Sequence, residues 1–494
     1  MGYAKPIQHC LIIEKEIDDM GEARNKGSFE DRQKEALKRN KRKLVELMGD
    51  RDPQSSEYLR AGIAPFLALM SADKWQRRRA SILDALNGIQ LTGKLATARP
   101  IRVREDEIGW YLFLCEQSLD DPLCMDVSQT ARIAPFFAGI GSKWQFAHRV
   151  TGLDKKIREI LHKAKKTPDG LIFEILVALS YAEKDWDVEL LDEKPPSKSP
   201  DMVVRKDEVE IYVECKRLER RTSYAERERN DFLIIWDAAT DTLWNKQQWV
   251  WFKGVFHVEP SSLPRDFLAK IFNEKLPIGQ GETLIYDGVE ATIYARQIDK
   301  FAAQNHLKDW QVKMHSAALS TLLGGDWAPL NSSVSIAQLV KPAYVNGCEA
   351  PILGGYIQEM NWACGFTRDF DSEISLNKKS KDITSLLADA ISQVPSDKAS
   401  IIHIAAETME GPEVERIRTQ KIIESMSQLS PGKPLLSVRF HRLQANQTVD
   451  KLWEMDETVQ KFQPSDLPDT QFVTSAVVPT TVEQRDGAHW DLYP

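Results

Sequence analysis

Three side chains in one short stretch have the chemistry to bind a divalent cation and act on water. The stretch is SPDMVVRKDEVEIYVECK (199–216), and the three residues are Asp201, Glu214 and Lys216. Val, Ile and Tyr recur through it, which favours two strands, and the polar pair at 207–208 supplies a turn between them. The sequence therefore predicts a β-hairpin that carries acidic residues.

A turn through residues 207–208 fixes which residues face each other across the hairpin, and it sets Asp201 opposite Glu214. Directly opposed residues share a face, because side chains alternate along a strand. One face would carry Asp201, Val203, Arg205, Glu210, Tyr212, Glu214 and Lys216. The other face would carry only apolar side chains, those of Met202, Val204, Val209, Ile211, Val213 and Cys215.

This register places the two carboxylates about 5 Å apart, with the Lys216 ammonium about 7 Å further along its strand. Two anionic carboxylates at that distance repel each other unless a cation lies between them or one is protonated. Mg²⁺ resolves the conflict, because it takes oxygen ligands at about 2.0–2.1 Å and keeps several waters. Lys216 would then orient or deprotonate one such water, whose pKa the metal lowers. The alternative is a surface hairpin with a solvated polar face and an exposed Glu-Lys pair.

A fourth acidic residue, Glu174, is the only charged residue in the run LIFEILVAL (171–179). A helix that is apolar around most of its circumference is normally buried. An unpaired carboxylate there would cost several kcal/mol, so it needs a metal ion, a cationic side chain or a proton. We favour the metal, and the alternatives are an exposed helix edge or a structural Arg or Lys partner.

These motifs together resemble the PD-(D/E)xK nucleases, the restriction-endonuclease-like superfamily. The match consists of a Pro-Asp pair at 200–201, a Glu-Cys-Lys triplet at 214–216 and Glu174 on the preceding helix. The order helix, strand, strand, strand, helix over roughly 167–245 also fits the core of that family. Some relatives carry a glutamine and a tyrosine on the next helix; here Tyr224 is present without such a glutamine, so this element is not carried over.

The resemblance implies a role for each matched residue. Asp201 and Glu214 would ligate Mg²⁺, for which Mn²⁺ could substitute, and the backbone carbonyl of Cys215 would add a ligand. Lys216 would assist the attacking water, and Glu174 would hold the metal or a water bound to it. The implied activity is hydrolysis of phosphodiester bonds, with DNA favoured over RNA, by an endonuclease of the kind used in restriction or phage defence.

Basic residues near the hairpin and in the N-terminal region suggest contacts with nucleic acid. Arginines that could contact phosphates follow the lysine strand at Arg217, Arg220, Arg221, Arg227 and Arg229. Three glutamates interleave with them, so a solvated helix face is an equally good interpretation. The clusters KRNKRK (38–43) and QRRR (76–79), with Trp75 and Trp144, allow a nucleic-acid groove in the N-terminal region.

Hydrophobic periodicity outlines the elements that must position these residues. Spacing of three and four predicts helices within residues 20–95, at 153–166 and at 167–184, whereas 109–117 fits either a buried strand or a short helix. A short strand follows in WDVELLDE, and a long helix in SYAERERNDFLIIWDAATDTLW. From residue 381 onward helices and strands alternate, which indicates βαβ units with some parallel pairing.

Two segments compete to complete the sheet after the lysine strand, namely 247–258 and the helix-strand unit at 386–406. The second would make residues 260–380 an insertion, and we favour it slightly. His403 and His441 lie in strand-like runs and are predicted to be core or edge residues rather than metal ligands.

We therefore predict an α/β fold, α+β overall, with a restriction-endonuclease-like mixed-sheet core flanked by helices. A mainly helical N-terminal domain would span 1–150, the nuclease-like core 151–445 and a C-terminal extension 446–494. The residues after about Pro464 lack periodicity, which predicts an extended or poorly ordered tail.

Composition narrows the class of protein further. The net charge of −8 shows no global basic signature, so nucleic acid would have to be bound by a local patch. Six scattered cysteines without a C-x-x-C pair indicate a reducing compartment, and no apolar run approaches the ~20 residues of a membrane span. We expect a cytoplasmic Mg²⁺-dependent nuclease without membrane contact, acting alone, as a homo-oligomer or with a regulatory partner. The alternative is a non-catalytic nucleic-acid-binding or assembly module on the same fold.

Overall fold

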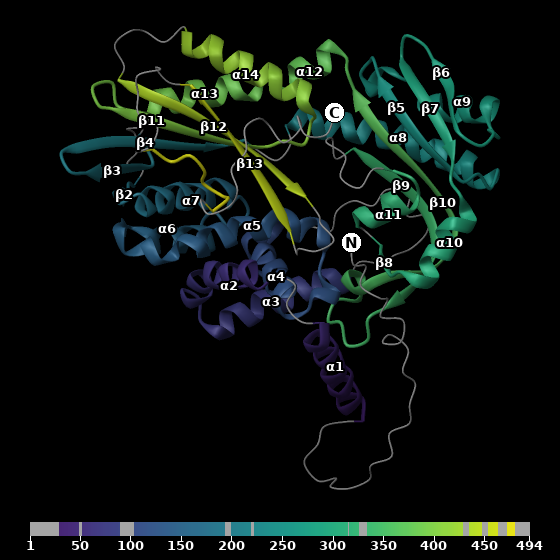
Figure 1. Ribbon diagram of the computed structural model, residues 1–494, viewed down its shortest axis with the longest axis horizontal. Helices are drawn as coiled ribbons and strands as arrows, with labels where there is room; N and C mark the ends of the chain where they lie inside the picture. The colour runs from purple at the N-terminus through teal and green to yellow at the C-terminus, as the bar shows by residue number, and fades with distance from the viewer. Residues whose placement is uncertain are drawn as a thin grey trace, which may run out of the picture.

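Two β-sheets with helices packed around them make up the protein (Figure 1). This combination of helices and mixed sheets confirms the predicted α+β class. The computed structural model describes residues 29–48, 52–88, 103–192, 199–218, 222–314, 316–325, 333–427, 434–446, 453–462 and 472–479.

In the described part of the chain, the larger sheet has seven strands in the order β1-β2-β3-β4-β11-β12-β13. Strands β2, β3 and β4 form an antiparallel meander, β11 and β12 run parallel to β4, and β13 is antiparallel to β12. The strands are β1 (Val150–Thr151), β2 (Asp187–Leu190), β3 (Met202–Lys206), β4 (Val209–Arg217), β11 (Ser400–Glu407), β12 (Leu435–Asn446) and β13 (Glu454–Phe462). The meander therefore lies next to parallel strands from a distant part of the sequence.

The hairpin forms with the predicted register. Val203 lies opposite Tyr212, and Arg205 lies opposite Glu210. The turn residue Asp207 has φ of 52°, in the left-handed region that Asp tolerates better than most residues. The apolar face packs against helix α7 (Asp169–Glu183), and its buried members are Met202, Val204, Ile211, Val213 and Cys215.

After β4 the chain leaves the larger sheet and returns only at β11. Helix α8 (Ser223–Asn245) leads into the second sheet, and α13 (Asp382–Gln393) leads back to β11, which pairs directly with β4. The segment 247–258 contributes strand β5 to the second sheet instead. Of the two continuations, the structure has the helix-strand unit at 386–406, and the excursion begins with α8, earlier than residue 260.

The second sheet has its own aromatic core. Its strand order among the described residues is β6-β7-β5-β10-β8, with β9 paired to β10. Phe232 and Trp236 on α8 pack edge-to-face on Phe366, with ring centroids 5.4 and 5.7 Å away. The elements are β5 (Val250–Phe256), α9 (Phe267–Lys275), β6 (Glu282–Asp287), β7 (Ala291–Gln297), α10 (Lys300–Asp309), β8 (Val312–Lys313), α11 (Ala317–Leu322), β9 (Val334–Tyr344), β10 (Gly355–Phe370) and α12 (Glu373–Lys379).

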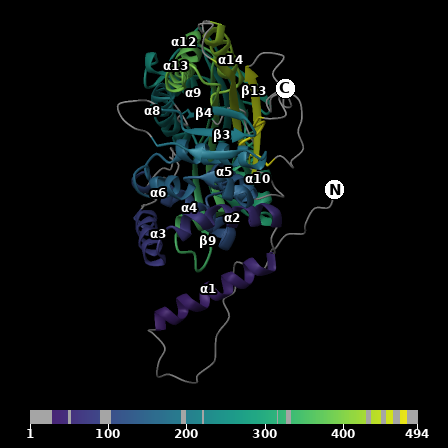
Figure 2. The same cartoon turned by 90° about the vertical axis from the view of Figure 1, so that its left-hand side faces the viewer.

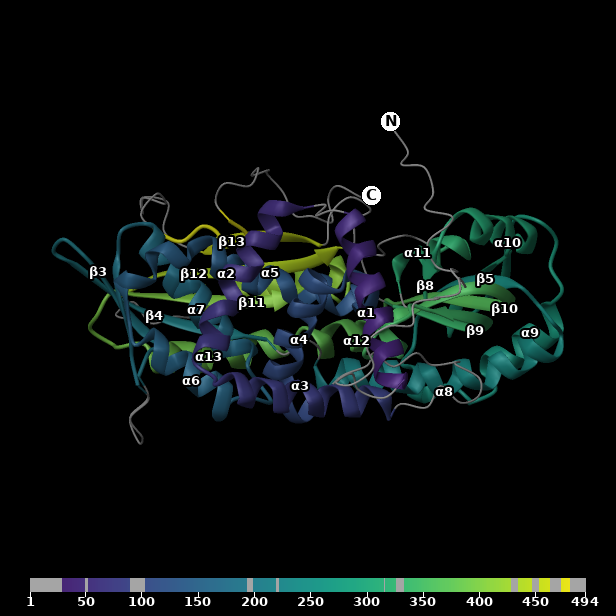
Figure 3. The same cartoon turned by 90° about the horizontal axis from the view of Figure 1, so that it is seen from below.

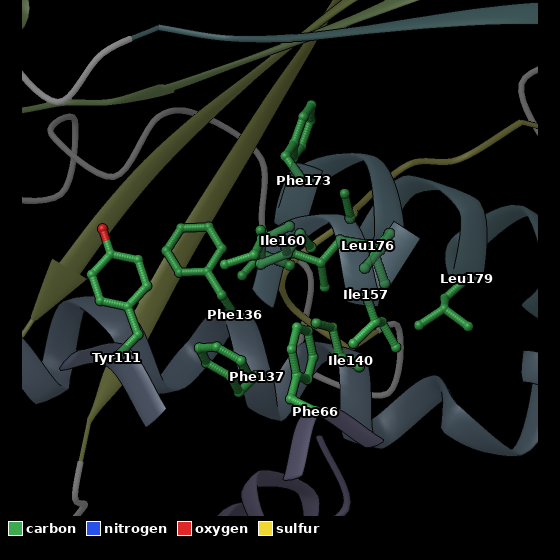
Figure 4. Close-up of a cluster of buried hydrophobic side chains, with 14 of the residues drawn as sticks. Phe66, Tyr111, Phe136, Phe137, Ile140, Ile157, Ile160, Phe173, Leu176 and Leu179 are labelled. Atoms are coloured by element: carbon green, nitrogen blue, oxygen red, sulfur yellow. The ribbon is translucent and has the colours of Figure 1, made fainter. Parts of the chain in front are cut away.

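The N-terminal helices share a hydrophobic core with the larger sheet. Figure 4 shows Phe66 and Phe137 beside Ile157 and Leu176 in this cluster. Residues 109–117, for which the sequence left two alternatives, lie in a helix, α4. Figures 1 and 2 show α1 projecting below the rest of the protein. The helices are α1 (Phe29–Met48), α2 (Pro53–Ala68), α3 (Ala72–Asn87), α4 (Glu107–Asp120), α5 (Val127–Lys143), α6 (Leu153–His162) and α7.

The C-terminal region contributes to the fold, so the prediction of an extended or poorly ordered tail is wrong for residues 472–479. Their apolar side chains are buried in the main core: Phe472, Val473, Ala476 and Val477. The Glu457 carboxylate on β13 accepts the backbone N–H groups of residues 476–478, each at 2.8 Å. Lys143 donates to the Ala476 carbonyl oxygen at 2.8 Å. Because side chains rather than a helix or strand satisfy this backbone, the segment has no periodicity to detect.

Both histidines are fully buried, as the sequence predicted, and they extend the same network. Tyr181 contacts His403 at 3.1 Å, His403 contacts His441 at 2.9 Å, and His441 contacts Glu457 at 2.7 Å. Burial tends to raise the pKa of Glu457, but His441 and the backbone N–H groups lower it to about 2. The histidines therefore connect α7 to the C-terminal segment through β11, β12 and β13.

Two glycines allow helices α2 and α5 to touch. A Cβ atom on Gly62 would lie 1.8 Å from the carbonyl oxygen of Phe137, and one on Gly141 would lie 1.8 Å from that of Tyr58. Any side chain at either position must therefore push the two helices apart.

We predict that Gly141→Ala lowers the free energy of unfolding by about 2 kcal/mol or more, because the added methyl group overpacks this crossing. Gly170→Ala on α7 is the matched control, since a Cβ there would meet no heavy atom within 4 Å. Chemical denaturation of the two variants measures the difference. Equal effects at the two positions would show that the crossing does not require glycine.

Candidate active site

The four predicted site residues come from the β3–β4 hairpin and from the helix that packs on it. Asp201 immediately precedes β3, Glu214 and Lys216 lie on β4, and Glu174 lies on α7, which packs on the apolar face of the hairpin. Helix α13 packs against the opposite face of β4, where Leu218 joins Ile383 and Leu387 in a hydrophobic cluster.

The hairpin carboxylates are held in position by the backbone and by Lys216. Asp201 Oδ2 accepts the N–H of Cys215 at 2.7 Å. Glu214 is fully buried, and its Oε1 atom lies 2.7 Å from the Lys216 ammonium. The second oxygen, Oε2, is buried without a hydrogen-bond partner among the described residues. A buried carboxylate oxygen in that state carries a desolvation cost that a bound cation would offset.

Glu174 is 7% exposed, as expected for a helix that is apolar on most sides. Its Oε2 atom forms an ion pair with Lys156 on α6 at 2.7 Å. This is the cationic partner that the sequence left open as an alternative to a metal. The sequence does not single out Lys156, because five lysines occur in the segment 153–166 and nothing in the sequence distinguishes the inward-facing one.

The charges of the three carboxylates act on one another. Burial and the charge of Asp201 raise the pKa of Glu214 to about 8, although Lys216 opposes the shift. Burial and the charge of Asp201 likewise raise the pKa of Glu174 to about 8, against the effect of Lys156. Asp201 thus couples the hairpin to the helix, and the group holds more negative charge than its environment accommodates.

Lys216 is held as an ammonium ion. Burial alone would lower its pKa, but Glu214, Asp201 and Asp389 outweigh burial and raise it. An ammonium can orient a water molecule or stabilise an anion, but it cannot accept a proton. Of the two roles that the sequence allowed for this lysine, the structure favours orientation over deprotonation.

Two residues of α13 were missed by sequence reasoning. Lys216 Nζ donates to Gln393 Oε1 at 3.0 Å and lies 3.4 Å from Asp389 Oδ2. Gln393 in turn donates to Asp389 at 2.9 Å. No local signal could have found them, because both lie more than 170 residues after the lysine they contact. Gln393 and Asp389 therefore cover the polar face of β4 and hold the Lys216 ammonium group in place.

The donor set suits a hard cation. In the part of the chain described, Glu174, Asp201 and Glu214 do not form a group of three ligand atoms all within 4.8 Å of one another. Mg²⁺ does not need such a group, since it is usually bound through one or two carboxylates and retains several waters. Opposed positions on the hairpin supply two carboxylates, and the unpartnered Oε2 of Glu214 is the oxygen that fits a cation.

The structure rules out one of the five arginines that the sequence suggested as phosphate contacts. Arg217 cannot contact phosphate, because its side chain is 3% exposed, ion-paired with Glu407 at 2.6 Å and packed over Phe136. Its position at the end of a central strand turns it into the core. Arg227 is exposed on α8 and Arg229 is half-buried, while Arg220 and Arg221 lie outside the described residues.

The N-terminal basic clusters are partly occupied by acidic partners. Arg79 pairs with Glu349 at 2.5 Å and with Glu116 at 3.6 Å. Trp75 is 6% exposed and donates to Glu116, so it cannot stack on a base. The structure therefore weakens the prediction of a nucleic-acid groove at residues 76–79.

No protein-family model matches the sequence, and comparisons with curated proteins and with solved structures give no match either. Across the described residues, none of the helices combines the length and the apolar character that a membrane crossing requires.

The raised pKa of Glu214 predicts a pH-dependent stability. Between the ordinary value of 4.5 and about 8, the folded protein retains a proton that the unfolded chain releases, so the free energy of unfolding falls as pH rises. Glu214→Gln should reduce this slope by up to about 1.4 kcal/mol per pH unit. Denaturant titrations at several pH values, in chelator, measure it. Glu208→Gln, in the exposed hairpin turn, should keep the wild-type slope; identical slopes for all three proteins would contradict the assignment.

Proposed function

We propose that the protein is a Mg²⁺-dependent nuclease that hydrolyses phosphodiester bonds in DNA, with Mn²⁺ as an effective substitute. The observation that carries the proposal is the buried Glu214 carboxylate, whose Oε2 atom lacks a hydrogen-bond partner in the described part of the chain, while Asp201 and Lys216 lie beside it. The order of elements supports it, because α7, β2, β3, β4, α13 and β11 form a helix, an antiparallel meander, a helix and a parallel strand.

Each residue would have a definite task in this reaction. Asp201, Glu214 and the Cys215 carbonyl would hold the cation, and the Cys215 N–H keeps Asp201 aimed at the site. A bound Mg²⁺ would lower the pKa of a coordinated water and stabilise charge on a phosphoryl oxygen. The Lys216 ammonium would donate to the attacking water or to the phosphate. The oxygen of that water would bond to phosphorus as the bond from phosphorus to the sugar oxygen breaks. The water would release its proton to solvent, and solvent would protonate the departing sugar oxygen to a hydroxyl group.

Glu174 would act indirectly, through a water molecule. Lys156 holds it at 2.7 Å, and Asp201 influences its protonation. We assign it to a water of the cation rather than to the cation itself, because its lysine partner already offsets part of its charge.

We propose that this activity takes place in the cytoplasm and serves defence, as in a restriction or phage-defence nuclease. All cysteines in the described residues are free thiols, which suits a reducing compartment. The second sheet, inserted between β4 and α13, would offer a surface to a regulatory partner or a second copy of the chain.

The competing proposal is a non-catalytic nucleic-acid-binding or assembly module. The observation in its favour is that lysines already neutralise two of the acids, through the pairs Glu174–Lys156 and Glu214–Lys216. Such a module would bind DNA in chelator and cleave with no metal.

We predict that Lys216→Ala and Glu214→Gln each reduce Mg²⁺-dependent DNA cleavage by about a hundredfold or more, because each removes charge stabilisation from the reacting centre. Plasmid and single-stranded DNA are incubated with Mg²⁺, with Mn²⁺ or with chelator. Glu208→Gln is the control and should cleave as the wild type does. Undiminished cleavage by Lys216→Ala would overturn the mechanism, and DNA binding without cleavage in any metal would favour the module.

A further inference from the structure

A second group of metal-ligating side chains lies where the N-terminal helices meet the second sheet. It consists of Asp121 after α4, Cys124 at the end of the short helix η2 (Pro122–Cys124), and Cys348 in the loop between β9 and β10. One ligand atom of each residue lies within 4.8 Å of those of the other two. Within the described ranges, no other three His, Cys, Asp or Glu side chains meet this condition.

Only one of the two oxygens of the buried Asp121 carboxylate has a hydrogen-bond partner among the described residues. Asp121 is 8% exposed, and its Oδ1 atom is buried without a hydrogen-bond partner in the described part of the chain. Cys124 is fully buried, and both cysteines are free thiols. An unpartnered carboxylate oxygen next to two sulfur atoms is the donor arrangement of a cation site.

The backbone is shaped to close over the two sulfur atoms. A Cβ atom on Gly354 would lie 3.0 Å from the Cys348 sulfur and 3.3 Å from the Cys124 sulfur. Gly354 ends the short helix η5 (Pro351–Gly354), which contacts η2. Glycine at position 354 leaves room for the sulfur atoms of both Cys124 and Cys348 beside the backbone of η5.

A nearby lysine balances the charge of the group. Lys41 on α1 lies 2.5 Å from Asp121 Oδ2 and donates to the Gly347 carbonyl at 2.8 Å. Two thiolates, one carboxylate and a divalent cation sum to one negative charge, which Lys41 neutralises. Figure 3 shows α1 between the other N-terminal helices and the second sheet. Lys41 on this helix contacts Asp121 and the Gly347 carbonyl oxygen.

We propose that Asp121, Cys124 and Cys348 bind one zinc ion, which fastens the β9–β10 loop to the N-terminal helices. Thiolates are soft ligands that favour zinc over Mg²⁺, and the two thiols release their protons to solvent when they bind. Zinc sites usually have four ligands, so a water molecule would supply the fourth beside these three side chains. This zinc site is independent of the proposed nuclease function.

The test is a titration of the full chain with Co²⁺ alone, after treatment with chelator and reductant and removal of both. One equivalent of Co²⁺ should give near-ultraviolet thiolate-to-cobalt absorption and the visible bands of tetrahedral cobalt, and Zn²⁺ should abolish both. Zn²⁺ should also raise the melting temperature of the wild type. If the wild type shows no such absorption, or if the two thiols form a disulfide and bind no metal, the proposal is wrong.

Substitutions locate the ligands. Cys348→Ser, in a half-buried loop, and Cys124→Ser should each lose the charge-transfer band, and Asp121→Asn should weaken Co²⁺ binding by about tenfold or more. Cys115→Ala removes a fully buried thiol of α4 outside the group and should bind Co²⁺ as the wild type does. Unchanged absorption in both serine variants would overturn the assignment.

The zinc proposal and the nuclease proposal can be contradicted independently. Glu214→Gln should bind one Co²⁺ at the thiols like the wild type, whatever its effect on DNA cleavage. Cys348→Ser should lose the cobalt absorption whether or not the protein cleaves DNA. Cleavage after chelation is therefore measured with Mg²⁺ restored alone and with Mg²⁺ and Zn²⁺ restored together.

Discussion

The arrangement around the hairpin depends on one constraint, the burial of negative charge at the centre of the larger sheet. Glu214 is fully buried on β4, and Asp201 and Glu174 raise its pKa further. Burying an ionised carboxylate costs several kcal/mol unless a cation, a proton or hydrogen bonds offset it. Lys156 and Lys216 supply part of that offset through their pairs with Glu174 and Glu214. The apolar face of the same hairpin has no such requirement and packs on α7 as ordinary core.

One buried ion-pair network joins the carboxyl ends of the parallel strands β4 and β11. Arg132 on α5 donates to Glu407, at the end of β11, at 2.6 and 2.8 Å. Arg217, at the end of β4, pairs with the same carboxylate at 2.6 Å, and Arg132 also reaches Asp169 at the start of α7. Removing one partner from such a buried network would leave an uncompensated charge, so these ions specify the junction of helices and sheet.

Sequence reasoning succeeded where the determinants are local. The hairpin register follows from alternation with period two and a turn at 207–208, and helix α7 follows from its apolar run. It failed where a residue's partner is distant. Lys156 resembles its neighbours, Gln393 and Asp389 contact Lys216 from far along the chain, and residues 472–479 are buried without periodicity. Strand order had to be chosen between two segments because both have strand character, and only tertiary packing decides between them.

The lysine pairs do not remove the case for a metal ion at the hairpin. Glu174, Asp201 and Glu214 carry three negative charges when ionised, whereas Lys156 and Lys216 supply two positive charges. Burial and the charge of Asp201 raise the pKa values of both glutamates to about 8, so protons can meet the difference near neutral pH. A proton and a divalent cation compete for the same oxygens, so a site that holds protons near neutral pH is one where a cation finds ligands already gathered. In the proposed nuclease, the lysines would keep these acids together in the absence of metal, and Lys216 would donate to an anion bound by the cation.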